Sequence, residues 1–126
     1  ISYYHINTLI RICQGELWEN TYMKSQPQFQ KTEDYKPKSE KEKNLIQAFT
    51  LLKNKEEVAD FLRDLLTLAE IGEFANRLEM VRLLKKGYSY LKIAKEIGTS
   101  TTTVTRVAHW YYHGCGGYAR IVDKLS

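Results

Sequence analysis

Hydroxyl and basic side chains are concentrated in one short stretch of the chain, residues 90–109, with the sequence YLKIAKEIGTSTTTVTRVAH. Threonine can contact base edges in the major groove of DNA through its hydroxyl or its methyl group, and arginine can bind guanine or phosphate. A solvated helix face is the alternative, but threonine is a mediocre helix former and four of them lie within residues 101–105. The sequence therefore predicts DNA as the partner, contacted by Ser100, Thr101, Thr102, Thr103, Thr105, Arg106, Lys92 and Lys95.

The apolar and glycine positions of the same stretch fit a helix-turn-helix. Two helices that cross steeply at a short turn leave room only for small side chains at their contact, and Ala94 occupies that position. Gly98 is expected to end the first helix in a left-handed conformation. A hydroxyl from residues 99–101 is expected to cap the second helix. The other side chains predicted to face the core are Ile93, Ile97, Val104 and Val107.

Positive charge is concentrated in the same half of the chain. Residues 1–76 carry 10 Lys and Arg against 12 Asp and Glu, whereas residues 77–126 carry 9 against 3. A basic face of this kind is typical of a phosphate-binding surface. The candidates for phosphate contact are Arg82, Lys85, Lys86, Lys92, Lys95, Arg106, Arg120 and Lys124.

Length and composition predict one modest helical domain in a chain of 126 residues. The apolar opening ISYYHINTLIRIC is interrupted by His5 and Arg11 and is shorter than the roughly 20 apolar residues needed to cross a bilayer. It also lacks the layout of a signal peptide, so a cytoplasmic location is expected. Cys13 and Cys115 form neither a disulfide framework nor a CxxC motif, and we expect reduced thiols.

Catalysis finds no support in these residues, and the sequence predicts neither an enzyme nor a metal site or cofactor. There is no phosphate-binding glycine loop and no paired-carboxylate motif. His113 and Cys115 alone offer too few ligands for a metal. His109 and His113, four residues apart, could chelate a metal, but the aromatic residues 110–112 between them favour packing against the body of the protein.

Composition divides the N-terminal part of the chain in two. Residues 1–22 begin without methionine and precede Met23, so we expect them to be an upstream extension. Residues 23–44 contain both prolines and mostly charged or amide side chains, which cannot bury enough apolar area to offset chain entropy. They are predicted to form a polar arm or linker.

Helical periodicity begins at Leu45, and residues 45–126 are predicted to form an all-α domain. Asn54 is a possible cap for the second helix. Leu65 on the second helix and Phe74 on the third are expected to be buried. The helices are expected over residues 45–53, 55–67, about 71–86, the helix-turn-helix at 90–109, and 118–125.

Three stretches in this order resemble the Trp repressor family, and its YerC/YecD-type members in particular. LLT at 65–67 followed by AEI at 69–71 resembles the leucine-rich junction of the family. RLEMVRLLKKG at 77–87 resembles its helix that ends in two leucines, a basic pair and glycine. TTVTR at 102–106 resembles its recognition-helix signature. The resemblance covers about two thirds of the chain.

The resemblance implies an intertwined all-α homodimer that presents two recognition helices to a two-fold symmetric DNA operator. The sequence independently favours a dimer, because the helices of residues 45–68 are apolar on more than one side. Half-sites about one helical turn apart would follow. The expected function is sequence-specific transcriptional regulation, with repression as the expected mode.

In the Trp repressor family two arginines hold the amino-acid corepressor, and they match Arg77 and Arg106 here. The alternative is that Arg77 makes an ion pair on the helix surface, for example with Glu73, and that Arg106 binds phosphate. Three departures from the family pattern weigh against tryptophan: Val107 replaces a glycine and would crowd a pocket, the segment between Gly87 and Gly98 is one residue shorter, and Leu91 and Ala94 occupy basic positions. Another small-molecule effector stays open.

A helical protein–protein interaction module, without sequence-specific DNA binding, is the alternative function. Trp110, Tyr111 and Tyr112 would then form a partner surface instead of part of the core. Burial separates the two interpretations, because a closed aromatic cluster favours core and an exposed one favours docking. RNA binding ranks third, since the aromatic residues of the basic half lie only at helix ends.

Overall fold

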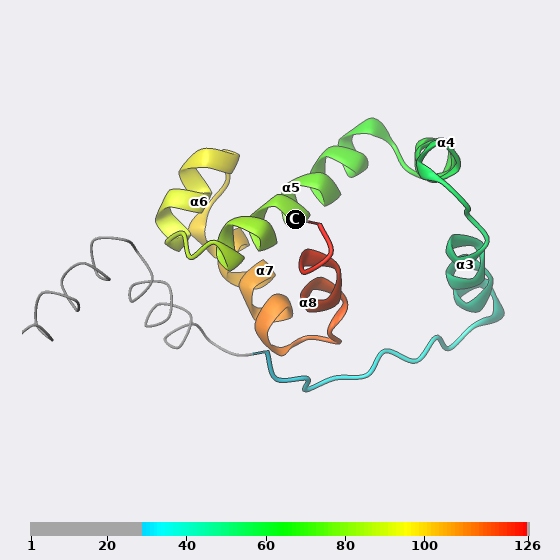
Figure 1. Cartoon of the computed structure of the whole chain (residues 1–126), viewed down its shortest axis with the longest axis horizontal. Coiled ribbons are helices and arrows are strands. Elements are labelled where there is room, and N and C mark those ends of the chain that lie inside the picture. The colour runs from blue at the N-terminus through cyan, green and yellow to red at the C-terminus, as the bar shows by residue number, and fades with distance from the viewer. Residues whose placement is uncertain (1–28, 126) are drawn as a thin grey trace, which may run out of the picture.

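The computed structural model describes residues 29–125, which form six α-helices and no strand (Figure 1). The predicted all-α fold is confirmed, whereas the extension predicted at residues 1–22 lies outside the described residues. None of the described helices is long and apolar enough to cross a membrane. The helices are α3 (Glu40–Thr50), α4 (Lys55–Leu65), α5 (Leu68–Lys85), α6 (Tyr90–Ile97), α7 (Thr101–His113) and α8 (Gly117–Val122).

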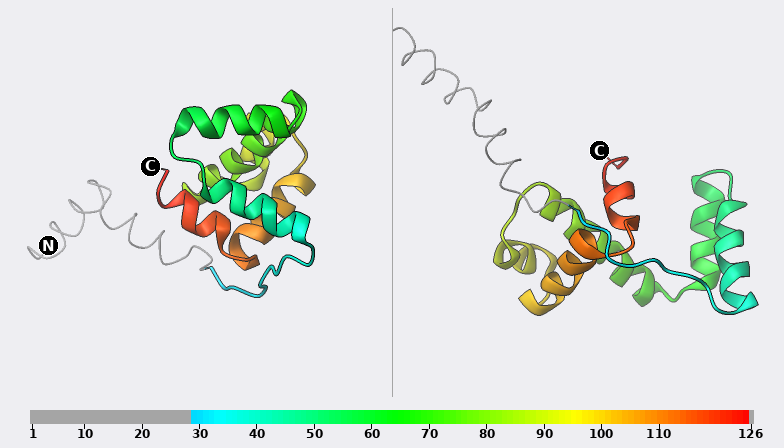
Figure 2. Two further views of the ribbon diagram at one scale, coloured as in Figure 1. Left: turned by 90° about the vertical axis from the view of Figure 1, so that its right-hand side faces the viewer. Right: turned by 90° about the horizontal axis from the view of Figure 1, so that it is seen from below.

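The core lies among α5, α6, α7 and α8, which pack into one body (Figure 2). The C-terminal half of α5 runs through this body, and α6, α7 and α8 cover it from different sides. Among the described residues every buried side chain comes from these four helices: Met80, Val81, Leu83, Leu84, Ile93, Ala94, Val104, Val107, Ala108, Tyr112 and Val122. The helix-turn-helix is therefore held by a core that continues into α5 and α8.

Helices α3 and α4 stand apart from this body, and α4 meets it only at the start of α5 (Figure 2). Neither helix contains a buried residue, and an edge-on contact of the Phe49 and Phe61 rings, with centroids 5.3 Å apart, joins the two. The predicted burial of Leu65 and Phe74 is wrong for the single chain, since these side chains are 45% and 46% exposed. Both side chains belong to an apolar helix face, but no segment of the described chain covers that face.

Two helices begin earlier than periodicity predicts, because polar caps precede their apolar residues. Helix α3 starts at Glu40, inside the segment assigned to the polar arm, where the Ser39 hydroxyl accepts the Glu42 N–H. Helix α5 starts at Leu68 instead of residues 71–73. A capping box fixes this start, in which the Thr67 hydroxyl accepts the Glu70 N–H and the Glu70 carboxylate accepts the Thr67 N–H.

Residues 29–38, which precede α3, form an extended segment. It begins beside the C-terminal end of α7 and leads to the start of α3 (Figure 1). The Gln30 N–H donates to the Tyr112 carbonyl at 2.8 Å, and the Thr32 hydroxyl donates to the His113 carbonyl. The carbonyls of a last helical turn have no partner inside the helix. This part of the predicted polar arm therefore caps the C-terminal end of α7.

Candidate nucleic-acid interface

The turn between α6 and α7 is built by glycine and serine, as the sequence predicts. Gly98 has a φ of +80°, and its N–H and that of Thr99 both donate to the Ala94 carbonyl, at 2.9 and 3.0 Å. Ser100 is the residue that caps α7, because its hydroxyl accepts the Thr103 N–H at 3.2 Å. The left-handed turn and a hydroxyl cap within residues 99–101 are thus confirmed.

The contact between the two helices is closed and apolar. Ile93 and Val104 are fully buried, and Ala94 beside them is 5% exposed. The small Ala94 side chain allows α6 and α7 to approach closely, while Ile97 packs partly buried at the edge. The inward positions predicted for the helix-turn-helix are confirmed, and its outward face carries polar side chains together with the exposed Tyr90 and Leu91 of α6.

Seven of the eight residues predicted to contact DNA are exposed. On α7, Thr101, Thr102, Thr105 and Arg106 are exposed and Thr103 is half-buried. On α6, Lys92 and Lys95 are exposed, and the Lys92 ammonium group lies 3.9 Å from the centroid of the Tyr88 ring. The remaining residue, Ser100, is exposed but already serves as the cap of α7.

Two of the basic residues proposed for phosphate contact have acidic partners within the chain. The Arg82 guanidinium lies 2.9 Å from the Glu79 carboxylate, and the Lys85 ammonium lies 2.8 Å from that of Asp123. These pairs are solvent-exposed and individually weak, but they reduce the positive charge at the end of α5. Lys92, Lys95 and Arg106 make no ion pair within the described residues, so unpaired charge is available around the turn.

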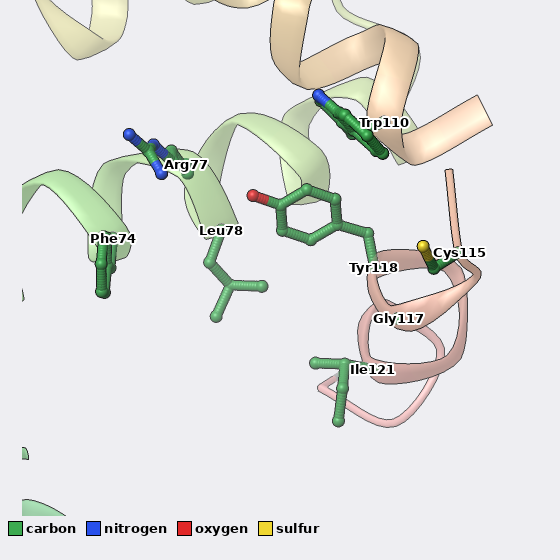
Figure 3. Close-up of a pocket in the computed structure, with 8 residues that line it drawn as sticks. All are labelled: Phe74, Arg77, Leu78, Trp110, Cys115, Gly117, Tyr118 and Ile121. Carbon is green, nitrogen blue, oxygen red and sulfur yellow. The ribbon is translucent and has the colours of Figure 1, made fainter. Parts of the chain in front are cut away.

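A second feature is an open apolar cavity of about 710 Å³ between α5, the end of α7 and α8 (Figure 3). Arg77 supplies its only charged side chain and lies over the Phe74 ring, 5.4 Å from its centroid. The alternative ion pair with Glu73 is not formed within the described residues. Tyr118 points its hydroxyl toward Arg77, and burial raises the pKa of this phenol. The lining residues are Phe74, Arg77, Leu78, Trp110, Cys115, Gly117, Tyr118 and Ile121.

The structure does not bring the predicted effector-binding arginines together in this cavity. Arg77 lines it, whereas Arg106 lies exposed on the outward face of α7. Val107, which was predicted to crowd a pocket, is 6% exposed and belongs to the core, and its effect on ligand binding stays a prediction. Its methyl groups pack on the inner side of α7, at the position where the resemblance implies a glycine in the family.

The aromatic residues at the end of α7 divide between core and surface. Tyr112 is buried and Tyr111 half-buried, with ring centroids 4.7 Å apart, but Trp110 is 47% exposed. His109 and His113 lie with ring centroids 5.7 Å apart. No group of three or more His, Cys, Asp or Glu residues that could hold a metal occurs within residues 29–125.

The family model for the Trp repressor protein matches residues 40–126. The chain belongs to the Trp repressor family, whose members are helix-turn-helix regulators. It is 38% identical over 82 residues to protein YerC of Bacillus subtilis, covering 65% of this chain and 79% of YerC. The match thus includes the YerC-type members that the sequence motifs resemble.

Two crystal structures have the same fold. One is a TrpR-like protein from Eubacterium eligens, with a TM-score of 0.65, 35% identity, and coverage of 70% of this chain and 91% of that chain. The other is a candidate Trp repressor from Staphylococcus aureus, with a TM-score of 0.64, 34% identity, and coverage of 70% and 88%. The two structures are therefore similar to this chain in sequence as well as in fold.

Ser100 has a structural role that can be separated from DNA contact. Ser100→Ala removes the acceptor of the Thr103 N–H and should lower the free energy of unfolding by about 1 kcal/mol. Ser100→Asp, which caps a helix as well as serine does, should retain the stability of the parent chain. Urea unfolding followed by circular dichroism, at one fixed protein concentration, measures both. Equal stability of the alanine variant and the parent chain would contradict the capping role.

Proposed function

We propose that this protein is a sequence-specific DNA-binding transcriptional regulator that acts as a homodimer, with repression as its mode. The observation that carries the proposal is the two-sided character of α7. Val104 and Val107 face the core, while Thr101, Thr102 and Arg106 are exposed beside a turn with unpaired positive charge. A helix of this kind can lie in the major groove and offer hydroxyl and guanidinium groups to base edges and phosphates.

The homodimer is supported by the apolar surface of α3, α4 and the start of α5. Several large apolar side chains exposed on neighbouring elements are a feature of interaction sites. A second copy would cover this surface symmetrically, and the two-fold axis would relate two copies of α7. The side chains concerned are Leu45, Ile46, Phe49, Leu51, Leu65, Leu68 and Phe74, which are 42–68% exposed.

The dimer is tested by making this surface polar. The double variant Leu65→Gln/Leu68→Gln should dissociate toward the 14.7 kDa monomer, because both side chains lie on the apolar surface at the α4–α5 junction. Leu91→Gln is the matched control, since Leu91 is 59% exposed on α6, outside that surface. Sedimentation velocity over a concentration series measures the assembly. A double variant that associates like the parent chain would contradict the proposal.

A protein-docking module is the second candidate function, and the exposure of Trp110 favours it. Exposed tryptophan is enriched at the centres of protein interfaces. Tyr111 and Tyr112, however, pack against or within the core, so the predicted three-residue aromatic patch is reduced to one exposed ring. DNA binding is therefore the stronger proposal.

Binding-site selection from random DNA, followed by gel shift, tests the regulator directly. If Arg106 makes a bidentate contact to a base, Arg106→Ala should weaken the selected site by about 1–3 kcal/mol, or about 5- to 150-fold in Kd. Lys53→Ala removes one exposed charge from the turn between α3 and α4 and is the matched control. Unchanged affinity of the Arg106 variant would remove this residue from the interface. Failure of any sequence to outcompete bulk DNA would favour the docking module.

The same gel shifts, repeated with and without tryptophan, address the effector. We propose that DNA binding does not require tryptophan, because only one of the two arginines lines the cavity. Other amino acids and aromatic acids are tested in parallel, since the cavity combines apolar walls with one guanidinium group. DNA binding that appears only after tryptophan is added would contradict this part of the proposal.

A further inference from the structure

The four threonines of α7 differ in what their hydroxyl groups can still do. The Thr105 hydroxyl donates to the Thr101 carbonyl at 2.8 Å, one helical turn back. The Thr103 hydroxyl lies 3.1 Å from that of Ser100, so these two share a hydrogen bond. The hydroxyls of Thr101 and Thr102 make no hydrogen bond within the described chain. The outward face of α7 therefore offers two uncommitted hydroxyl groups and one committed one, on Thr105.

A committed hydroxyl changes the DNA chemistry that Thr105 can recognise. A threonine hydroxyl has one hydrogen to donate, and that of Thr105 is used on its own helix. Most acceptors in the major groove, including guanine O6 and N7 and adenine N7, require a donor. Two contacts are left to Thr105: its γ-methyl against an apolar group, or its oxygen accepting from an amino group. The apolar group that the major groove presents is the C5-methyl of thymine.

We propose that Thr105 recognises a thymine in each half-site through methyl–methyl contact, and that its hydroxyl serves to fix the side chain. The hydrogen bond to the Thr101 carbonyl holds the side chain in one rotamer before DNA binds, so the methyl group is presented without a further loss of side-chain entropy. Thr105 and Arg106 are both exposed on α7. This inference rests on the proposed DNA-binding function and assigns a base preference within it.

Deoxyuridine differs from thymidine only in lacking the C5-methyl group, so it tests the contact directly. Each thymine of the selected operator is replaced in turn, and Kd is measured by gel shift for the full chain at one salt concentration. At one thymine per half-site, replacement should weaken binding of the parent chain by about fourfold, the effect of removing one buried methyl group. Thr105→Ser, which lacks the γ-methyl, should bind the thymidine and deoxyuridine sites equally.

Thr105→Val separates the methyl contact from a hydroxyl contact, since valine retains the methyl group and lacks the oxygen. Whatever its absolute affinity, this variant should keep the fourfold preference for thymidine. Thr50→Ser is the matched control, because the Thr50 hydroxyl also donates to a carbonyl of its own helix, that of Gln47, but lies on α3. It should show the preference of the parent chain.

Two results would overturn the inference while leaving the proposed function intact. The first is a selected operator at which no deoxyuridine replacement distinguishes the parent chain from Thr105→Ser. The second is loss of the thymidine preference in Thr105→Val, which would assign recognition to the hydroxyl oxygen. Failure to select any operator would overturn the proposed function as well, so the two failures are distinguishable.

Discussion

The close crossing of α6 and α7 at Ala94 is the contact on which the rest of the structure depends. The side chain of Ala94 is a single methyl group, so the two helices can approach closely. Ile93 and Val104 are fully buried as a result. The turn at Gly98 holds the two helices at this crossing without a strained residue, because glycine accepts a φ of +80°. Once Val104 and Val107 point inward, the helical period leaves Thr102, Thr105 and Arg106 outside. The polar face is thus a consequence of the packing.

Helix α5 joins the helix-turn-helix of α6 and α7 to the surface proposed for dimerisation. Its C-terminal half contributes Met80, Val81, Leu83 and Leu84 to the core, whereas Leu68 and Phe74 near its start are exposed. One helix of 18 residues therefore belongs to both parts. A partner that covers the first half of α5 would fix the position of α7, because α5 is one continuous helix and its second half packs against α7. In the proposed dimer, a partner would cover α3 and α4, which stand apart from the body of the single chain.

The helix-turn-helix was predictable because glycine, alanine and capping residues constrain it locally. The start of α5 could also have been predicted, because Thr67 and Glu70 match the sequence signature of a capping box. Apolar periodicity alone does not detect this signature. The exposure of Leu65 could not be predicted from the sequence. Apolar spacing shows that a helix has an apolar face, but it does not show which segment or which chain covers that face. The committed hydroxyl of Thr105 depends on a side-chain rotamer, about which residue order gives no information. DNA contact by the individual residues stays a prediction.

The positions of the two arginines limit how any small molecule could influence DNA binding. A molecule in the cavity beside Arg77 would contact α7 only at Trp110, one helical turn beyond Arg106. It would lie between α5, α8 and the end of α7, and would contribute no atom to the outward face around Thr102. Its influence would have to pass through the position of α7. Val107 in the core and the cap formed by residues 30 and 32 both hold that helix in place without a ligand. These contacts are the physical reason to expect DNA binding by the protein alone.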